Sequence, residues 1–128
     1  MTAWSNDELT KIGTAEELQI ASCRRDGTLR APVTIWVVRL GDELYVRSVN
    51  GRDSAWFRGV QVSHEGHIQA GGIDRDVTFV EEASSDLNDQ IDAVYHTKYR
   101  RYPSSVSHIT SPEARSAAIK LVAHSSSL

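Results

Sequence analysis

The sequence predicts an antiparallel α+β domain whose strongly bent strands close as a small barrel. Three observations predict this class. Strand-like runs follow one another through glycine-containing turns at residues 25–27, 41–43 and 71–72. A helical apolar period begins near residue 85, and one further strand-like run comes after it. The short connections also exclude a parallel Rossmann-type sheet, because each parallel crossover needs about a dozen residues or more.

The first predicted elements are a short helix and a hairpin. Ser5 and Glu8 have the spacing of a capping box and Gly13 is suited to end a helix, which predicts a helix over residues 5–12. Strands over 18–23 and 31–40 then flank an Asp-Gly turn. The second strand is β-branched, aromatic and almost continuously hydrophobic, which is typical of a strand covered on both faces. We therefore expect it at the centre of the sheet.

The remaining elements alternate strands with one short and one long helix. In the next strand, Leu44 and Val46 face one side while Tyr45 and Arg47 face the other. The longest helix is expected where apolar residues recur at helical spacing ahead of a basic end. The predicted ranges are a strand over 44–48, one or two helical turns over 54–60, a hairpin over 67–81, the long helix over about 85–101, a polar loop over 104–111, one turn over 112–115 and a strand over 118–123.

Composition bounds the class of protein. The chain has 128 residues, 40% hydrophobic and 24% charged, so we expect a single domain over residues 1–128. A net charge of -3 at pH 7 argues against a nucleic-acid partner. Cys23 is the only cysteine, which excludes an intramolecular disulfide and a structural cysteine-zinc cluster. No apolar run approaches the roughly 20 residues of a membrane helix, and no secretory signal is visible, so we expect no membrane association and a cytoplasmic location.

The most informative segment runs from Tyr45 to Arg58. It gathers cationic and hydroxyl side chains around a glycine loop, directly before a predicted helix start; they are Arg47, Ser48, Arg52, Ser54 and Arg58. Backbone N–H groups at a helix start and guanidinium forks suit the several oxygens of a phosphate or carboxylate. This segment therefore predicts an anion site for a phosphorylated cofactor. The alternative is an exposed loop whose arginines pair with neighbouring acids.

Aromatic residues form the second candidate feature. Trp36 on the 31–40 strand and Trp56 after the glycine loop either wall a planar ligand or fill a core. Tyr95 and Tyr99 on the long helix either pack it against the barrel or close the ligand pocket, and Tyr45 projects from the strand before the glycine loop. We take the three tyrosines as candidate substrate contacts.

The other titratable residues predict no further site. His64 and His67 are three residues apart, but the Glu-Gly pair between them indicates a turn without the rigid helical face that zinc motifs use, so no metal site is predicted. Asp86, Asp89 and Asp92 are interpreted as solvated acids in the first turns of the long helix. No residue is assigned as a catalytic acid or base.

Three motifs together carry a family resemblance. They are the strand from Pro32 to Trp36, the Gly-Asp-Glu-Leu-Tyr hairpin over 41–45, and the Asn-Gly-Arg loop over 50–52 with the Trp56-Phe57 pair behind it. In these motifs the chain resembles the split β-barrel flavin-binding superfamily. It is most similar to the deazaflavin-dependent nitroreductase branch and to an uncharacterised bacterial family of nitroreductase-like proteins. The resemblance covers about residues 31–79.

The resemblance implies an antiparallel six-stranded split β-barrel that forms a homodimer, with FMN or the deazaflavin cofactor F420 in a groove at the subunit boundary. It implies hydride transfer to a small organic acceptor. The implied cofactor contacts are Arg47, Ser48, Arg52 and Ser54 for the phosphate, Trp56 and Arg58 at the adjoining helix start, and Thr34 and Trp36, with Val33, for the ring. Two departures from the family pattern, Ala55 in place of a proline and residues 62–65 in place of an Asn-Pro segment, keep a second reading open. That reading is a cofactor-free small-ligand binding protein, or a non-redox enzyme such as a cyclase or isomerase, which uses the same groove.

Overall fold

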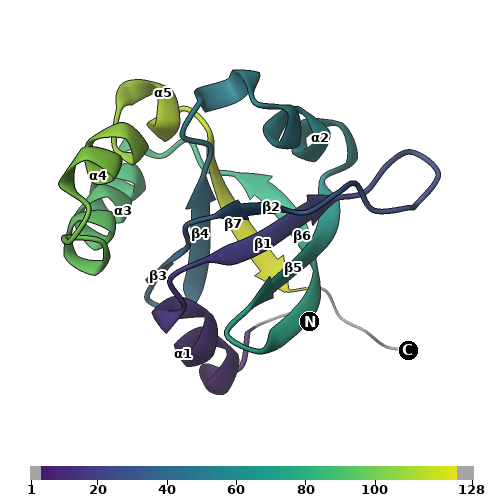
Figure 1. Ribbon diagram of the computed structural model, residues 1–128, viewed down its shortest axis with the longest axis horizontal. Helices are drawn as coiled ribbons and strands as arrows, with labels where there is room; N and C mark the ends of the chain where they lie inside the picture. Colours follow the sequence, from purple (N-terminus) through teal and green to yellow (C-terminus); the bar gives the residue numbers. More distant parts are fainter. Residues whose placement is uncertain (1–3, 124–128) are drawn as a thin grey trace.

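A single curled antiparallel sheet forms the body of the molecule, with helices packed around it (Figure 1). The computed structural model describes residues 4–123. Its strands are β1 (Leu18–Ser22), β2 (Val33–Ile35), β3 (Val38–Leu40), β4 (Glu43–Arg47), β5 (Glu65–Ala70), β6 (Ile73–Glu81) and β7 (Ala118–Ala123). Along the sheet the order is β2-β1-β5-β6-β7-β4-β3, and every neighbouring pair is antiparallel. This is the α+β split-barrel architecture that the sequence predicts.

The predicted strand over 31–40 is broken into β2 and β3 at Trp36 and Val37. One half pairs with β1 and the other with β4, so this single bent segment occupies both ends of the strand order. Counted as one wall, it makes the barrel six-stranded. The expectation that it lies at the sheet centre is wrong: Val33 and Thr34 are exposed, and β6 holds the middle place. A continuous apolar run shows only that a segment is apolar. An edge strand beside a pocket and a central strand covered on both faces have the same composition, so the run could not distinguish these two positions.

The first helix, α1 (Asn6–Thr14), covers one end of the barrel. The predicted capping box is present: Glu8 donates its backbone N–H to Ser5 Oγ, and Ser5 donates its own to Glu8 Oε1. The helix buries Leu9 and Ile12 in the barrel core. Ahead of it, Trp4 Nε1 donates to the carbonyl of Leu121 on β7 at 2.9 Å, which ties the start of the described chain to the sheet.

The glycine loop becomes a short 3-10 turn, η1 (Gly51–Asp53), followed by α2 (Ala55–Ser63). The helix runs past the predicted 54–60 and ends at His64, whose φ of 58° is left-handed. Phe57 and Val60 bury the inner face of α2 in the barrel core.

Three helices cluster beside the barrel, to the left of β4 in Figure 1, and the last of them contacts η1. They are α3 (Ser85–Lys98), α4 (Pro103–Ile109) and α5 (Pro112–Arg115). The long helix ends three residues before the predicted 101. The prediction of a loop over 104–111 is wrong, because Pro103 begins a helix whose Val106 and Ile109 are buried. Two apolar residues among polar ones were too few to reveal that helix in the sequence.

The hydrophobic core has two parts separated by the wall of β4. Leu44 and Val46 point into the barrel, and Tyr45 packs with α3 and α4 on the outside. The predicted alternation along this strand is thus confirmed. Within residues 4–123, no helix combines the length and apolar character needed to cross a membrane.

Candidate functional site

A pocket of about 380 Å³ opens between β2, the end of β4, the start of α2 and α4. Its lining is mostly apolar and hydroxyl-bearing. The residues that line it are Val33, Thr34, Ile35, Trp36, Arg47, Ser48, Val49, Asn50, Ser54, Trp56, Ser105 and Ile109. Pockets of this size and character hold small organic ligands. Six of the eight cofactor contacts expected from the sequence therefore lie around one cavity.

Aromatic side chains hold two walls of this pocket. The Trp36 ring stacks on the Tyr99 ring of α3, with centroids 3.8 Å apart and planes 3° from parallel. Trp56 meets the buried Phe57 ring edge-on at 6.1 Å. Each indole is thus fixed by a buried aromatic partner, which gives the pocket rigid surfaces for a flat ligand.

A third wall is β2, which is an edge strand bonded on one side to β1. Its outer edge lies along the pocket, since all three of its residues line the cavity. An edge strand presents backbone N–H and C=O groups in alternation. Such an edge can recognise a planar ring that itself alternates donors and acceptors.

Hydroxyl groups define the end of the pocket at α2. Ser54 Oγ accepts the backbone N–H of Phe57 at 3.4 Å and so caps the helix, while its hydrogen bond with Ser48 Oγ spans 2.7 Å. Gly51, with φ of 71°, makes the turn that brings the two serines together, and a side chain there would press on Glu113. Backbone N–H groups at a helix start and paired hydroxyls favour an anionic or polar ligand group.

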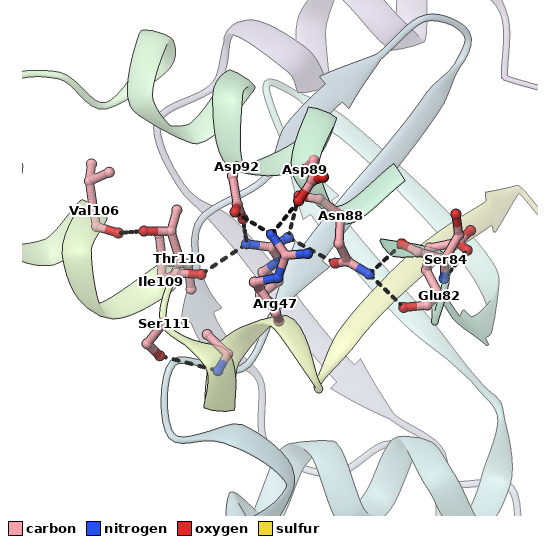
Figure 2. A network of polar contacts seen from close by, with 12 residues as sticks. Arg47, Glu82, Ser84, Asn88, Asp89, Asp92, Val106, Ile109, Thr110 and Ser111 are labelled. Atoms are coloured by element: carbon pink, nitrogen blue, oxygen red, sulfur yellow. Dashed lines mark hydrogen bonds and ion pairs between the residues drawn. The ribbon is translucent and has the colours of Figure 1, made fainter. Parts of the chain in front are cut away.

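Arg47 belongs to the pocket lining, and its two terminal nitrogens are bonded to residues of α3 and α4 (Figure 2). Its side chain is 0% exposed, and one terminal nitrogen donates to Asp92 Oδ1 at 2.5 Å and to the Ile109 carbonyl at 3.2 Å. The other donates to the carbonyl and the side-chain oxygen of Asn88 at 3.0 and 2.8 Å. Only Nε is left as a buried nitrogen without a partner among the described residues. The sequence interpretation of Asp92 as solvated is wrong, because its carboxylate binds both Arg47 and Arg115 at 2.5 Å.

The other two arginines of the predicted anion site do not line the pocket. Arg52 donates to Glu81 Oε1 at 2.9 Å and to the Ser116 carbonyl at 2.8 Å. Arg58 donates twice to the backbone carbonyl of Asp53. Both guanidinium groups thus make their polar contacts within the protein: Arg52 pairs with an acid and a carbonyl, and Arg58 binds the backbone of η1.

The three candidate substrate tyrosines are buried behind the pocket wall. Tyr99 donates to the carbonyls of Glu16 and Val37, at 2.7 and 3.1 Å, and supports Trp36 from behind. Burial raises the pKa of Tyr45, Tyr95 and Tyr99, so each phenol stays protonated at neutral pH. Tyr99 supports the aromatic wall directly, while Tyr45 and Tyr95 belong to the buried cluster behind it.

Sequence reasoning missed the contribution of Ser105 and Ile109, which reach the pocket from α4. It also missed Val49 and Asn50, although both lie beside residues that it named. The only available signal was their position next to the glycine loop. Among residues 4–123, no group of three histidine, cysteine or acidic side chains is arranged to hold a metal ion. His67 instead faces Asp74 and Asp76, at 2.5 and 2.9 Å.

Residues 8–121 match the family model described as "Uncharacterized protein conserved in bacteria (DUF2255)". The chain belongs to this family. Among curated proteins, none matches its sequence.

Solved structures share the fold at low sequence identity. The heme storage protein HutZ from Vibrio cholerae is 13% identical with a TM-score of 0.65, over 94% of this chain and 90% of that one. An F420-H2-dependent reductase is 14% identical with a TM-score of 0.60, over 84% and 93%. A FAD-binding protein from Mesorhizobium loti is 18% identical with a TM-score of 0.57, over 96% and 92%. These likenesses establish the split-barrel fold alone, because one fold hosts many functions.

Proposed function

We propose that this protein binds a flavin or deazaflavin, FMN or F420, in the pocket between β2 and α2, and acts as an oxidoreductase on a small organic acceptor. The observation that carries the proposal is the convergence on one cavity of Trp36, Trp56, the edge of β2 and the Ser48–Ser54 hydroxyl pair. The similar folds of an F420-H2-dependent reductase and of a FAD-binding protein support it. When bound, such a cofactor supplies the hydride that the acceptor receives.

The residues of the pocket fit the parts of this cofactor class. Trp36 and Trp56 exclude water from a flat ring, and β2 offers backbone groups to the ring edge. Ser48, Ser54 and the first N–H groups of α2 suit a phosphate. Arg47 also belongs to the pocket lining, and its Nε is a buried nitrogen without a partner among residues 4–123.

Within the part of one chain that the structure describes, the pocket holds no side chain suited to deliver a proton. The pocket lining contains serine and threonine hydroxyls and one amide, and within the described chain no carboxylate, histidine, lysine or cysteine contributes to it. General acid catalysis by a side chain needs a titratable group within hydrogen-bond reach of the acceptor. The proton that the acceptor takes up is therefore expected to come from solvent or from the second copy of the chain proposed below.

A second copy of the chain is expected to complete the pocket. Val33 and Val49 belong to its lining, and these apolar side chains are 37% and 47% exposed. We propose a homodimer that covers these two side chains. Light scattering coupled to gel filtration should give twice the chain mass, and a monomer at tens of micromolar, roughly the usual working range, would contradict it.

One structural observation favours the cofactor-free alternative. Arg47 is neutralised by Asp92 and Arg52 by Glu81, so the pocket offers hydroxyl and amide donors to a phosphate without an uncompensated cation. A ligand whose group near Ser48 and Ser54 is uncharged fits these hydroxyl and amide donors equally well. The protein would then be a small-ligand binding module or a non-redox enzyme of the cyclase or isomerase kind.

Titration of the purified protein with FMN, F420 and riboflavin separates the two readings. Cofactor fluorescence and protein melting should both change with FMN or F420, and Ser105→Trp, which fills the pocket, should weaken binding at least about tenfold. Ser107→Trp on the same helix, outside the lining, is the matched control. If all three compounds leave the protein unchanged at near-millimolar concentration, the cofactor proposal fails and the alternative is favoured.

A further inference from the structure

A second cavity, of about 320 Å³, is lined by residues of α1, β3 and α3, where both helices contact β3. It is lined by Gly13 of α1, Arg39 of β3 and Ala93, Val94, Thr97 and Lys98 of α3. None of these residues lines the pocket described above. Two cationic side chains, an amine and a guanidinium, thus share a small cavity walled by glycine, alanine and valine.

Backbone contacts fix the amine in this cavity. Lys98 is half-buried, and its Nζ donates to the carbonyl of Val37 at 2.6 Å and lies 5.0 Å from the centre of the Tyr99 ring. The same carbonyl accepts from the Tyr99 hydroxyl at 3.1 Å. One N–H of Lys98 is therefore committed to the backbone, which orients the nitrogen at the cavity wall.

The guanidinium is held by a close contact with α1. A side chain on Gly13 would lie 3.0 Å from Arg39 Cβ, so the arginine stem packs on the bare backbone of the helix. Arg39 Nε donates to the Gly41 carbonyl at 2.8 Å, and a terminal nitrogen lies 4.0 Å from the 92% exposed Asp42. A pair this long and exposed competes weakly with a ligand carboxylate.

The charge state of Lys98 suits nucleophilic chemistry. Burial lowers the pKa of Lys98 to about 8, against the opposing charge of Glu16. The groups that face the amine are Glu16 before β1 and Tyr99 directly after α3, while Arg39 of β3 shares the cavity lining; Glu16 also accepts the Tyr102 hydroxyl at 2.7 Å. At about pH 7.5 roughly a quarter of Lys98 is then neutral, against roughly one in a thousand for an ordinary lysine.

We propose that Lys98 is a carbonyl-reactive amine, and that this cavity takes a small 2-oxo acid whose carboxylate is bound by Arg39. Lys98 Nζ adds to the carbonyl carbon, the carbonyl oxygen leaves as water, and a carbon–nitrogen double bond replaces it. With one proton from solvent the product is a protonated imine. That imine keeps a single N–H, and the Val37 carbonyl is already placed to accept it. The step needs no oxidant or reductant.

Reductive trapping on the whole protein tests this proposal. Glyoxylate with cyanoborohydride at about pH 7.5 converts each imine to a stable adduct, and peptide mass mapping reads the initial rate at every lysine. The chain supplies its own controls, Lys11 and Lys120, which are the only other lysines. We expect Lys98 to react at least about tenfold faster than either, with a rate that rises towards pH 8. Rates at the three lysines within about twofold of each other would overturn the proposal.

The carboxylate partner is tested by Arg39→Gln with two carbonyl probes. The variant should slow the reaction of Lys98 with glyoxylate at least about fivefold and leave that with acetaldehyde, which lacks the carboxylate, within about twofold of wild type. Lys11 and Lys120 in the same sample report any general change of folding or reagent. Equal slowing with both probes, or none with either, would overturn the role of Arg39.

Discussion

The buried arginine of the pocket lining gives the sharpest test of the structure. Arg47 is 0% exposed at its side chain, and Asp92, 22% exposed, is its charge partner at 2.5 Å. The same carboxylate holds Arg115, which also pairs with the 71% exposed Asp89 at 3.0 Å. The perturbation is Asp92→Asn, which removes the charge and keeps the size of the side chain.

The expected cost follows from what Arg47 loses and keeps. Removing one partner of a fully buried ion pair costs about 3–5 kcal/mol. Here the partner is partly exposed, and the guanidinium retains its hydrogen bonds to Asn88 and to the Ile109 carbonyl. We therefore expect Asp92→Asn to lower the free energy of unfolding by about 2 kcal/mol.

Urea unfolding at neutral pH measures this loss, with Asp89→Asn as the matched control. The control removes an acid from the same helix and the same arginine, Arg115, but at an exposed position, so it should cost under about 1 kcal/mol. In an Arg47→Met background, Asp92→Asn should lose most of its effect, because no buried charge remains to be stranded. Equal costs for the two Asn variants, or an undiminished cost of Asp92→Asn in the Arg47→Met background, would refute the reasoning.

Three further changes test other parts of the structure. Ser54→Ala removes the cap of α2 and should cost about 1 kcal/mol of unfolding free energy, while Ser63→Ala at the other end of that helix should cost less than half as much; equal losses by urea would contradict the capping role. Gly66→Ala should lower the free energy of unfolding by at least about 2 kcal/mol, because the new Cβ would lie 2.1 Å from the Ala21 carbonyl oxygen. Gly41→Asn is the control, since a side chain there meets open space and Asn accepts the φ of 63°. A G66A variant as stable as G41N in thermal melts would show that the β1–β5 contact is looser than described. Burial lowers the pKa of His67, but its hydrogen bonds to Asp74 and Asp76 outweigh that effect and leave the pKa raised, so the stability that the charged ring adds is present at low pH and lost as pH rises through that pKa. The difference in unfolding free energy between wild type and His67→Asn should therefore be larger at about pH 5.5 than at about pH 8.5. A pH-independent difference would contradict the pairing.

Local signals in the sequence predicted much of the fold. The Ser5–Glu8 capping box, the alternation along β4 and the Gly71-Gly72 turn each depend on residues within a few positions of one another, and each is present. The pocket was predictable in part for the same reason, because Ser48, Ser54 and Trp56 are neighbours in the chain.

Long-range partners account for what the sequence did not reveal. Arg47 is separated from Asp92 by 45 positions, and a helix period cannot show which acid will be covered by another element. The segment over 31–40 was misplaced because its two halves pair with strands at opposite ends of the order. Trp36 shows both sides of the problem: a ligand wall was one of two roles that the sequence left open for it, while the Tyr99 ring that supports it lies about sixty residues further along the chain.

A crystal structure of the protein grown with FMN or F420 tests the proposed function most directly. The account predicts density for a flat ring against Trp36 and Trp56, with its phosphate at Ser48, Ser54 and the first turn of α2. Ring density elsewhere on the surface, or a pocket that stays filled with solvent at saturating cofactor, would contradict it.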